Sequence, residues 1–348
     1  MAKIKKNYPK KKPEYKNKIR DLEIEYLAGL EDFVQKELRP YGRISQIKKN
    51  SLRLMYSSDL NKLSNLKTIV AAYLVVHFEI PRPKAILGQE NFTKLISEIR
   101  TVLELNNNFK SFRINAAGRD SSVFKRIAHE ISNATKLKYD AEEGELLLRF
   151  RREGNIWQVL IRLSPKALSA RNWRECNMQG GLNATVAYAI NELANIKPHE
   201  VYLNAMCGSG TLLIENNKAK KLLGLDNSAE AIKCAKANLE KASVQAKLFQ
   251  TDALKMPFEN GSIDLITADL PWGDATGKHS ENASLYKEFL KESARACTKQ
   301  ARLIILTHEL RIFENLIRKQ NIWKIKKELQ VYHGGHYPKI YLLTKLRN

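Results

Sequence analysis

Four consecutive residues, Asp269, Leu270, Pro271 and Trp272, combine groups that could activate a weak nucleophile. They follow an apolar run at 263–268 that we expect to be a β-strand. The amine on a nucleobase is a poor nucleophile because its lone pair delocalises into the ring. The Asp269 carboxylate and the Leu270 carbonyl can accept its protons, and Pro271 fixes the direction of that carbonyl. Trp272 offers a face for a base that has left its helix or loop. The alternative is an ordinary proline turn with a packed tryptophan.

A second group of residues indicates a pocket for a nucleoside cofactor. Gly208 and Gly210 lie between an expected strand and an expected helix, where they let the backbone turn sharply and approach a ligand. Such a turn alone is a weak signal, because many strand-to-helix turns contain glycine for packing. Asp226 ends the next expected strand, where it can accept both hydroxyls of a ribose. Asp252 follows the third strand, where it can accept from an adenine amine, with Met256 or Phe258 to cover the ring.

Missing motifs narrow the choice of cofactor. The sequence has neither the Gly-x-x-x-x-Gly-Lys-Ser/Thr loop nor the third glycine of a dinucleotide fingerprint. S-adenosylmethionine (SAM), whose sulfonium already activates its methyl group without a metal, fits both the pocket and the amine-activating element. The pair His333 and His336 could suggest a metal site, but no other ligand is grouped nearby. We therefore expect a glycine turn there, SAM as the cofactor, and no metal.

Strands and helices alternate without interruption in the second half of the chain. We expect strands at 201–204, 223–226, 246–249, 263–268 and 302–306, helices beginning at Thr211, Ala229 and Leu285, and final strands at 323–331 and 339–346. This order predicts an α/β, Rossmann-like domain with a doubly wound, mainly parallel sheet and a C-terminal antiparallel hairpin. The first half predicts α+β modules, with strands at 24–27, 51–56 and 111–115, a hairpin at 145–163, and helices near 29–38, 65–76, 92–105 and 122–134.

The charge balance indicates a polyanionic partner. Lys and Arg number 59 against 37 Asp and Glu, a formal net charge of +22, and such a field attracts nucleic acids or anionic membranes. The longest apolar stretch, 69–76, falls far short of the ~20 residues that span a bilayer, so we expect RNA and no membrane. The first twenty residues predict a disordered basic arm. The four cysteines show no paired spacing and no signal-peptide core follows Met1, so we expect free thiols in the cytoplasm.

Two motifs resemble those of a known family. Residues 204–215 look like the motif Asp-Pro-Met-Cys-Gly-Ser-Gly-Thr-Leu-Leu-Ile-Glu of THUMP-domain, SAM-dependent RNA guanine-N2 methyltransferases. Residues 269–273 are similar to their element Asp/Asn-Leu/Pro-Pro-Phe/Tyr/Trp-Gly. Upstream, 26–31 is similar to their ferredoxin-like module, and about 85–174 looks like the THUMP domain and its exit. The start of the helix that covers the cofactor resembles 181–185. Asn204 and Ala205 depart from the family's Asp-Pro, which removes a carboxylate that could contact the methionine end of SAM.

The resemblance implies five segments and a set of site residues. The segments are a basic arm (1–20), a ferredoxin-like domain (21–80), a THUMP RNA-binding domain (81–168), a linker (169–180) and a methyltransferase domain (181–348). The catalytic residues would be Asp269, Leu270, Pro271 and Trp272. The cofactor would contact Asn183, Thr185, Asn204, Met206, Cys207, Gly208, Ser209, Gly210, Thr211, Asp226, Asn227, Asp252, Ala253 and Asp269. RNA would contact Arg113, Arg119, Lys125, Arg126, Arg171 and Arg174, and the loop 274–284 would form a lid over the target base.

The resulting hypothesis is methyl transfer from SAM to the exocyclic N2 amine of a guanosine in tRNA, in the acceptor stem, by a monomer. A guanosine of 23S ribosomal RNA is the close alternative. An adenine-N6 methyltransferase would use a similar 269–272 element, although the THUMP-like front half argues against DNA. A non-catalytic RNA-binding adaptor is permitted by Asn204 and Ala205, whereas the retained Asp226, Asp252 and Asp269 argue against it.

Overall fold

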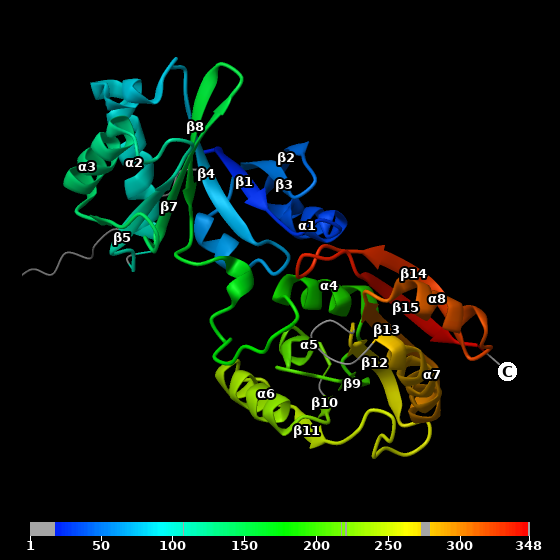
Figure 1. Cartoon of the computed structure of the whole chain (residues 1–348). Helices are drawn as coiled ribbons and strands as arrows, with labels where there is room; N and C mark the ends of the chain where they lie inside the picture. Colours follow the sequence, from blue (N-terminus) through cyan, green and yellow to red (C-terminus); the bar gives the residue numbers. More distant parts are fainter. Residues whose placement is uncertain (1–17, 107, 217, 220, 273–278, 347–348) are drawn as a thin grey trace, which may run out of the picture.

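The computed structural model describes residues 18–106, 108–216, 218–219, 221–272 and 279–346. The expected basic arm, up to residue 17, and the first part of the expected lid, 274–278, lie outside the described residues. The rest of that expected loop, 279–284, is instead the start of a helix (His279–Ala296), which begins earlier than the expected Leu285. The chain forms two halves, each built on one β-sheet and joined by an extended segment that follows β8 (Figure 1). No helix among the described residues is long and apolar enough to cross a membrane.

The N-terminal half contains an eight-stranded sheet in the order β2-β3-β1-β4-β8-β7-β5-β6. Its strands are β1 (Arg20–Glu25), β2 (Gly42–Ile47), β3 (Ser51–Tyr56), β4 (Ala71–Phe78), β5 (Ser111–Asn115), β6 (Lys138–Tyr139), β7 (Leu146–Glu153) and β8 (Ile156–Arg162). Its α-helices are α1 (Glu31–Leu38), α2 (Gln89–Leu105) and α3 (Ser122–Thr135). The sheet crosses the expected domain boundary at 80/81, because β4 pairs antiparallel with β8. The two modules expected from the sequence therefore share one sheet.

The expected helix at 65–76 is wrong. A short 3-10 helix (Leu60–Asn65) is followed by strand β4, which pairs with β1 on one side and β8 on the other. Seven of its eight residues are buried. A strand buried on both faces has a continuous apolar sequence rather than an alternating one, so its pattern cannot be told from that of a buried helix.

The C-terminal half contains a seven-stranded sheet in the order β11-β10-β9-β12-β13-β15-β14. Its strands are β9 (Val201–Ala205), β10 (Lys221–Asp226), β11 (Lys247–Gln250), β12 (Ile263–Asp269), β13 (Cys297–Thr307), β14 (Trp323–Gln330) and β15 (Lys339–Lys345). Strands β9 to β13 are parallel, whereas β15 runs antiparallel to both of its neighbours. This topology confirms the Rossmann-like sheet and the terminal antiparallel hairpin.

Helices cover both faces of this sheet (Figure 1). The helices are α4 (Ala184–Ala194), α5 (Thr211–Ile214), α6 (Ala229–Lys241), α7 (His279–Ala296) and α8 (Leu310–Arg318). Tyr202 belongs to the core that includes α4 and α6, and its strand neighbour Leu203 belongs to the core that includes α7 and α8, because successive strand residues point to opposite faces. Both faces are thereby closed. The carboxyl ends of β9, β10 and β12 are left as the edge where a ligand can bind.

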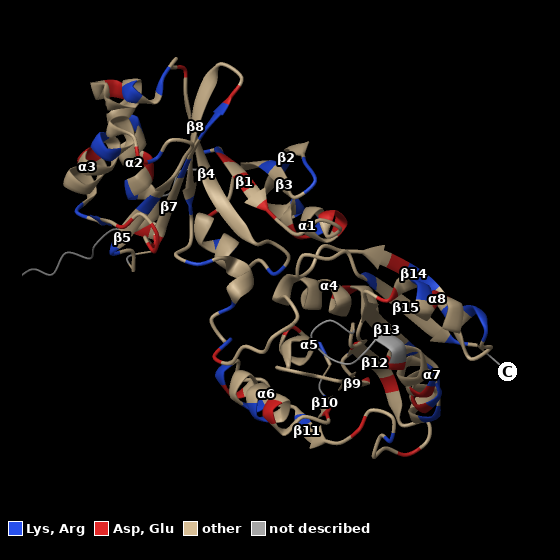
Figure 2. Ribbon diagram, viewed as in Figure 1, with Lys and Arg blue, Asp and Glu red and all other residues tan. Residues whose placement is uncertain are grey.

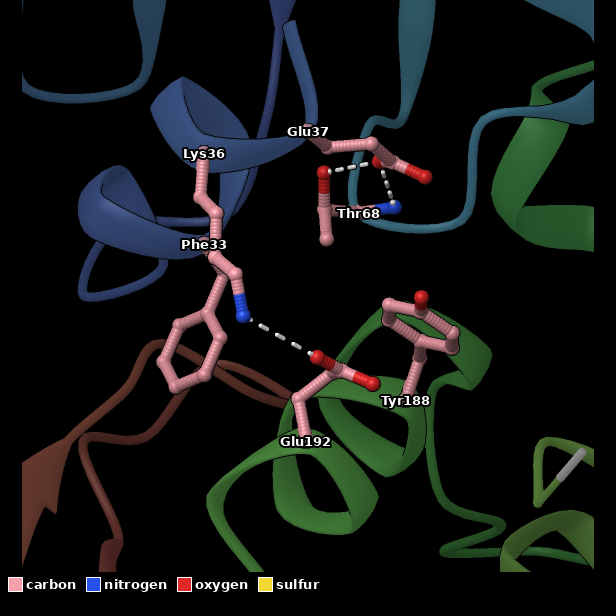
Figure 3. Close-up of a pocket in the computed structure, with 6 residues that line it drawn as sticks. All are labelled: Phe33, Lys36, Glu37, Thr68, Tyr188 and Glu192. Carbon is pink, nitrogen blue, oxygen red and sulfur yellow. Dashed lines mark hydrogen bonds and ion pairs between the residues drawn. The ribbon is translucent and has the colours of Figure 1, made fainter. Parts of the chain in front are cut away.

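The two halves contact each other through the segment after β1 and through α1. Gly29, with a φ of +92°, lies so close to β14 that a Cβ atom would stand 2.1 Å from the Gln330 carbonyl oxygen, and Tyr332 N–H donates to the Ala28 carbonyl at 2.9 Å. A pocket lies between α1 and α4, where Lys36 pairs with Glu192 at 3.4 Å (Figure 3). None of the residues lining this pocket belongs to the predicted site.

The expectation of four free thiols is wrong for two of them. Cys176 in the linker and Cys234 in α6 form a disulfide across 58 residues of sequence, with their Cα atoms 5.4 Å apart. Cys207 and Cys297 are free and buried. Asn238 of α6 reinforces the link, since its Oδ1 accepts from the N–H groups of both Glu175 and Cys176 at 3.0 Å. Spacing along the chain could not reveal this pair, because the fold alone brings the two segments together.

Candidate active site

The glycine turn after β9 is held open by an aspartate from β10. Gly208 N–H donates to Asp226 Oδ2 at 2.9 Å, and Ser228 N–H donates to Oδ1 at 3.0 Å. Met206, Gly208 and Gly210 have positive φ angles of 58°, 51° and 81°. Glycine adopts such angles without strain, whereas in Met206 the angle is strained, as is typical of functional turns. A Cβ on Gly208 would meet nothing within 4 Å. Gly208 therefore faces open space that a ligand can enter.

The two glycines have different tasks. A Cβ on Gly210 would lie 3.3 Å from the Cβ of Ala235, so this glycine lets α5 pack closely against α6. The neighbouring hydroxyls of Ser209 and Thr211 are 3.3 Å apart, and Cys207 N–H donates to the Leu225 carbonyl at 2.8 Å. These interactions fix the turn against its own domain.

Asn204 lies behind the turn rather than on its surface. It is 1% exposed, and its amide nitrogen donates to the Thr267 carbonyl at 3.1 Å, which links β9 to β12. Its Oδ1 is buried without a partner among the described residues. Asn204, which replaces the family's aspartate, thus places a neutral amide with one unsatisfied oxygen at this buried position. A charged carboxylate would be costly to bury there.

Asn183 and Thr185 form the N-terminal cap of α4. Asn183 Oδ1 accepts from the Thr185 N–H at 2.9 Å and from its hydroxyl at 2.8 Å, and Thr185 is fully buried. This is the usual use of asparagine before a helix. Both side chains have a structural role here, and their contact with a cofactor stays a prediction.

The two acidic residues predicted for the ribose and the adenine lie on adjacent strand ends. Asp226 ends β10, and Asp252 follows β11, with which β10 pairs in parallel. Asp252 is exposed, and its Oδ1 accepts from Leu254 N–H at 2.9 Å. Asn227 is exposed beside Asp226, whereas Ala253 is buried. Met256 is buried, and Phe258 packs edge-on against Phe249 with ring centroids 5.2 Å apart.

Asp269 ends β12 with an unsatisfied carboxylate oxygen. Its Oδ1 is buried with no partner among the described residues, and burial raises the pKa of its carboxyl to about 7. Tyr286, which the sequence did not single out, donates its hydroxyl to the Pro271 carbonyl at 2.6 Å. Leu270 N–H donates to the Leu306 carbonyl at 3.0 Å, so the backbone of the 269–272 element is fixed from two sides.

Three histidines surround Trp272. The ring centroids of His308, His333 and His336 lie 5.8, 5.7 and 6.0 Å from that of Trp272, and Trp272 Nε1 is buried without a partner among the described residues. His333 and His336 form an isolated β-bridge around a glycine turn, as expected. The described residues contain no group of three or more potential metal ligands. His308 follows β13 directly, so its place at the strand ends could have been predicted.

These residues fit SAM on the evidence of their own geometry. The open space beside Gly208 and the Asp226 carboxylate could hold the nucleoside, and the unsatisfied Asp269 Oδ1 lies at the end of β12, next to β9 in the sheet. The parallel strands bring these groups to one edge.

Two residues predicted to contact RNA bind groups within the protein instead. Arg171 is buried in an ion pair with Glu215 at 2.8 Å and also donates to the Lys67 carbonyl at 2.7 Å. Arg174 donates to the Leu182 carbonyl and to Thr211, and it lies over the Trp173 ring. These interactions correct the interpretation of Arg171 as an RNA ligand. Glu215 could have indicated this ion pair from the sequence, since a carboxylate at the end of an apolar helix needs a buried cation.

The other predicted RNA ligands lie on the N-terminal half. Lys125 and Arg126 are exposed on α3, whose opposite face buries Phe124, Ile127, Ala128 and Ile131. Arg119 pairs with Glu142 at 2.5 Å, and Arg113 donates to the Glu142 carbonyl at 3.0 Å, so both are partly engaged within the domain. Lys and Arg positions are spread over both halves of the chain rather than confined to one (Figure 2).

Comparison with known proteins defines the class. Residues 171–339 match the model of the RMKL-like methyltransferase domain. With the sheet order described above, this match identifies the chain as a SAM-dependent methyltransferase. The match covers both motifs, at 204–215 and 269–273, and agrees with the methyltransferase activity that they indicated.

Relatives match along nearly the whole chain. A tRNA (guanine(6)-N2)-methyltransferase of Methanocaldococcus jannaschii is 25% identical, covering 93% of this chain and 100% of its own. The crystal structure of TrmN from Thermus thermophilus superposes with a TM-score of 0.74 at 20% identity, covering 94% of this chain and 99% of that one. SMU.472, a methyltransferase solved in complex with SAH, gives a TM-score of 0.67 at 17% identity over 95% and 99% of the two chains. The similarity to these solved structures extends the fold to both halves.

Proposed function

We propose that the chain transfers the methyl group of SAM to the exocyclic N2 amine of a guanosine in tRNA. The observation that carries the proposal is the unsatisfied Asp269 Oδ1 at the end of β12, next to the Leu270 carbonyl. The name of the Methanocaldococcus jannaschii relative supports guanosine 6 as the target nucleotide. A ribosomal guanosine is a second candidate that the same chemistry would serve.

The protein groups have separate roles in this reaction. Bound SAM supplies a methyl group that its sulfonium makes electrophilic. Asp269 Oδ1 and the Leu270 carbonyl accept the two N–H groups of the guanine amine, which localises the nitrogen lone pair. Transfer of the methyl group would break its bond to sulfur, leave the cofactor as a neutral thioether and give the nitrogen an extra proton, which the Asp269 carboxylate would accept. A pKa of about 7 suits a group that must be ionised before the step and protonated after it.

Binding and positioning fall to the surrounding residues. Asp226 and Asp252 would accept from the ribose hydroxyls and the adenine amine, and the turn at Gly208 would lie against the cofactor. Trp272 would stack on the flipped guanine, with Tyr286 holding the Pro271 carbonyl in place.

The N-terminal half would bind the RNA. We assign 21–80 to a ferredoxin-like module and 81–168 to a THUMP module that together grip the acceptor stem, with Lys125 and Arg126 contacting phosphates. The chain would act as a monomer in the cytoplasm. Sedimentation of the free protein tests the monomer.

One experiment tests the reaction and its target. Purified protein is incubated with tRNA and with ribosomal RNA in separate reactions containing isotopically labelled SAM, and the digested nucleosides are identified by mass spectrometry. We expect labelled N2-methylguanosine from tRNA alone. Labelled N6-methyladenosine, or label in ribosomal RNA alone, would contradict the proposal. The Asp269→Asn variant should give no labelled nucleoside while its affinity for tRNA stays within about twofold, since only a neutral isostere is introduced.

A further inference from the structure

The turn between β14 and β15 has two differently used faces. His333 and His336 point to Trp272, as their ring distances of 5.7 and 6.0 Å show. Tyr332 and Tyr337, the residues next to them in sequence, are 38% and 43% exposed, and their rings lie 5.3 Å apart. The same short turn thus contacts the predicted catalytic tryptophan and presents an aromatic pair to solvent.

Exposed aromatic rings are rare in this structure. Five large hydrophobic residues are exposed among the described residues, and the two aromatic ones are Tyr332 and Tyr337. Scattered single residues of this kind need no explanation, whereas a contacting pair beside an active site indicates a binding surface.

A cation from the other half of the chain adjoins the pair. Lys49, in the turn between β2 and β3, places its Nζ 5.3 Å from the ring centroid of Tyr337 and 3.2 Å from its hydroxyl. Close approach of the two halves holds this arrangement, because Tyr332 N–H donates to the Ala28 carbonyl at 2.9 Å. A lysine beside a pair of aromatic rings, here tilted by 58° to each other, matches the chemistry of a nucleotide, whose base can stack on a ring and whose phosphate can contact the cation.

We propose that Tyr332, Tyr337 and Lys49 form a binding site for an unpaired nucleotide of the substrate RNA, next to the nucleotide that enters the catalytic site. This inference rests on the proposed function for the identity of the RNA. A guanine that stacks on Trp272 has left its helix, so a neighbouring or formerly paired base loses its own partner. The tyrosine pair, one residue away from the histidines that contact Trp272, would stack on that base. The net charge of +22 favours an anionic occupant.

Binding measurements on matched variants test this site. The double variant Tyr332→Ala/Tyr337→Ala should raise the Kd for a tRNA transcript, measured by fluorescence anisotropy, about tenfold or more. Tyr332→Phe/Tyr337→Phe should stay within about twofold because it keeps the rings, and Lys49→Gln should weaken binding about two- to fivefold and reduce its salt dependence. Leu346→Ala, which removes a comparably exposed side chain (39%) at the end of the chain, should leave the Kd unchanged. The Kd for SAM should be the same in all variants, which excludes misfolding.

A second measurement needs no variant. Ultraviolet crosslinking of the wild-type protein to tRNA, followed by mass spectrometry of the peptides, should place crosslinks on Tyr332 or Tyr337. Alanine variants that bind RNA as tightly as wild type, or crosslinks that avoid 330–339, would overturn the site. If the wild-type protein forms a dimer, the alanine double variant is a monomer and both bind RNA equally well, the tyrosine pair would instead serve self-association.

The two proposals fail in different ways. Binding and crosslinking are read without methyl transfer, so a wild-type protein that binds RNA through the tyrosines but makes no N2-methylguanosine would overturn only the proposed function. A protein that makes this nucleoside with unchanged Kd and turnover in the alanine variant would overturn only the tyrosine site.

Discussion

Asp226 Oδ2 accepts a hydrogen bond from the Gly208 N–H at 2.9 Å, which ties the end of β10 to the turn after β9. Ser228 N–H occupies one lone pair of the other oxygen. Each carboxylate oxygen keeps a second lone pair, so the same side chain can shape the turn and accept from a ribose.

Removing this carboxylate should therefore weaken cofactor binding. We expect Asp226→Ala to raise the Kd for SAM, measured by calorimetry, at least tenfold, which corresponds to about 1.4 kcal/mol or more. Asp140→Ala is the matched control, because Asp140 Oδ1 also accepts from two backbone N–H groups, at 3.1 and 2.9 Å, in the N-terminal half. An equal loss of SAM affinity in both variants would contradict the assigned role of Asp226.

Methyl transfer should depend on pH through Asp269. Burial raises the pKa of this carboxyl to about 7, and only the ionised form can accept the amine proton. We expect kcat/KM for SAM to rise about tenfold per pH unit below about 6 and to level off above about 8. His333→Gln should keep the same midpoint, because burial and the neighbouring Arg174 lower the pKa of His333. A flat profile between pH 6 and 8 would exclude Asp269 as the proton acceptor.

The same burial should make Asp269 costly for stability. With a pKa raised above its usual value, the folded state holds the proton more tightly than the unfolded state. The free energy of unfolding therefore falls as pH rises from about 4 to about 7 and stays low above that. Asp269→Asn should be more stable than wild type at pH 8 by on the order of 1–3 kcal/mol, and by much less at pH 4. Urea unfolding at the two pH values measures the difference; equal stabilisation at both would argue against this cause.

Charge on α3 should govern the salt dependence of RNA binding. Replacing Lys125 and Arg126 by glutamine should weaken tRNA binding and lower the slope of log Kd against log salt by about 1 for each phosphate that is no longer neutralised. Lys233→Gln/Lys236→Gln on α6 removes the same charge from another exposed helix face and should change the slope little. If the two double variants behave alike, α3 is not part of the interface.

The buried pair of Arg171 and Glu215 should matter for folding rather than for RNA. Arg171→Ala leaves an unpaired buried carboxylate, for which we expect a loss of about 3–5 kcal/mol in the free energy of unfolding. The double variant Arg171→Met/Glu215→Leu should lose much less, because neither charge remains. Its salt slope for tRNA binding should equal that of wild type. A reduced slope would restore Arg171 as an RNA ligand.

Local patterns predicted most of the elements that build the site. The strand ends carrying Asp226 and Asp269, and the glycine turn between β9 and α5, follow from apolar runs interrupted by residues that stop them. The amphipathic α3 and the hairpin of β7 and β8 were equally readable, because one face of each is buried and the period shows. A parallel sheet then places these strand ends at one edge without further information.

The features that the sequence could not predict depend on contacts between residues far apart in the chain. Strand β4 has no alternation because both its faces are buried. Arg171 is far from Glu215 in the sequence, and only the fold brings the two into contact. The same is true of Cys176 and Cys234. His308 follows β13, whereas His333 and His336 lie in the turn between β14 and β15, so their approach to Trp272 depends on the order of strands in the sheet. Whether the predicted cofactor residues touch SAM stays a prediction.

The pairing of β4 with β8 limits how this protein can be divided. Six residue pairs, from Tyr73 with Arg162 to Phe78 with Trp157, join them. A fragment that ended near residue 80 would leave β4 with a bare row of N–H and C=O groups, and such an edge recruits other chains into aggregates. The smallest piece of the N-terminal half with satisfied strands is therefore the whole of 18–162, and any recombination with a different catalytic domain has to exchange it as one block.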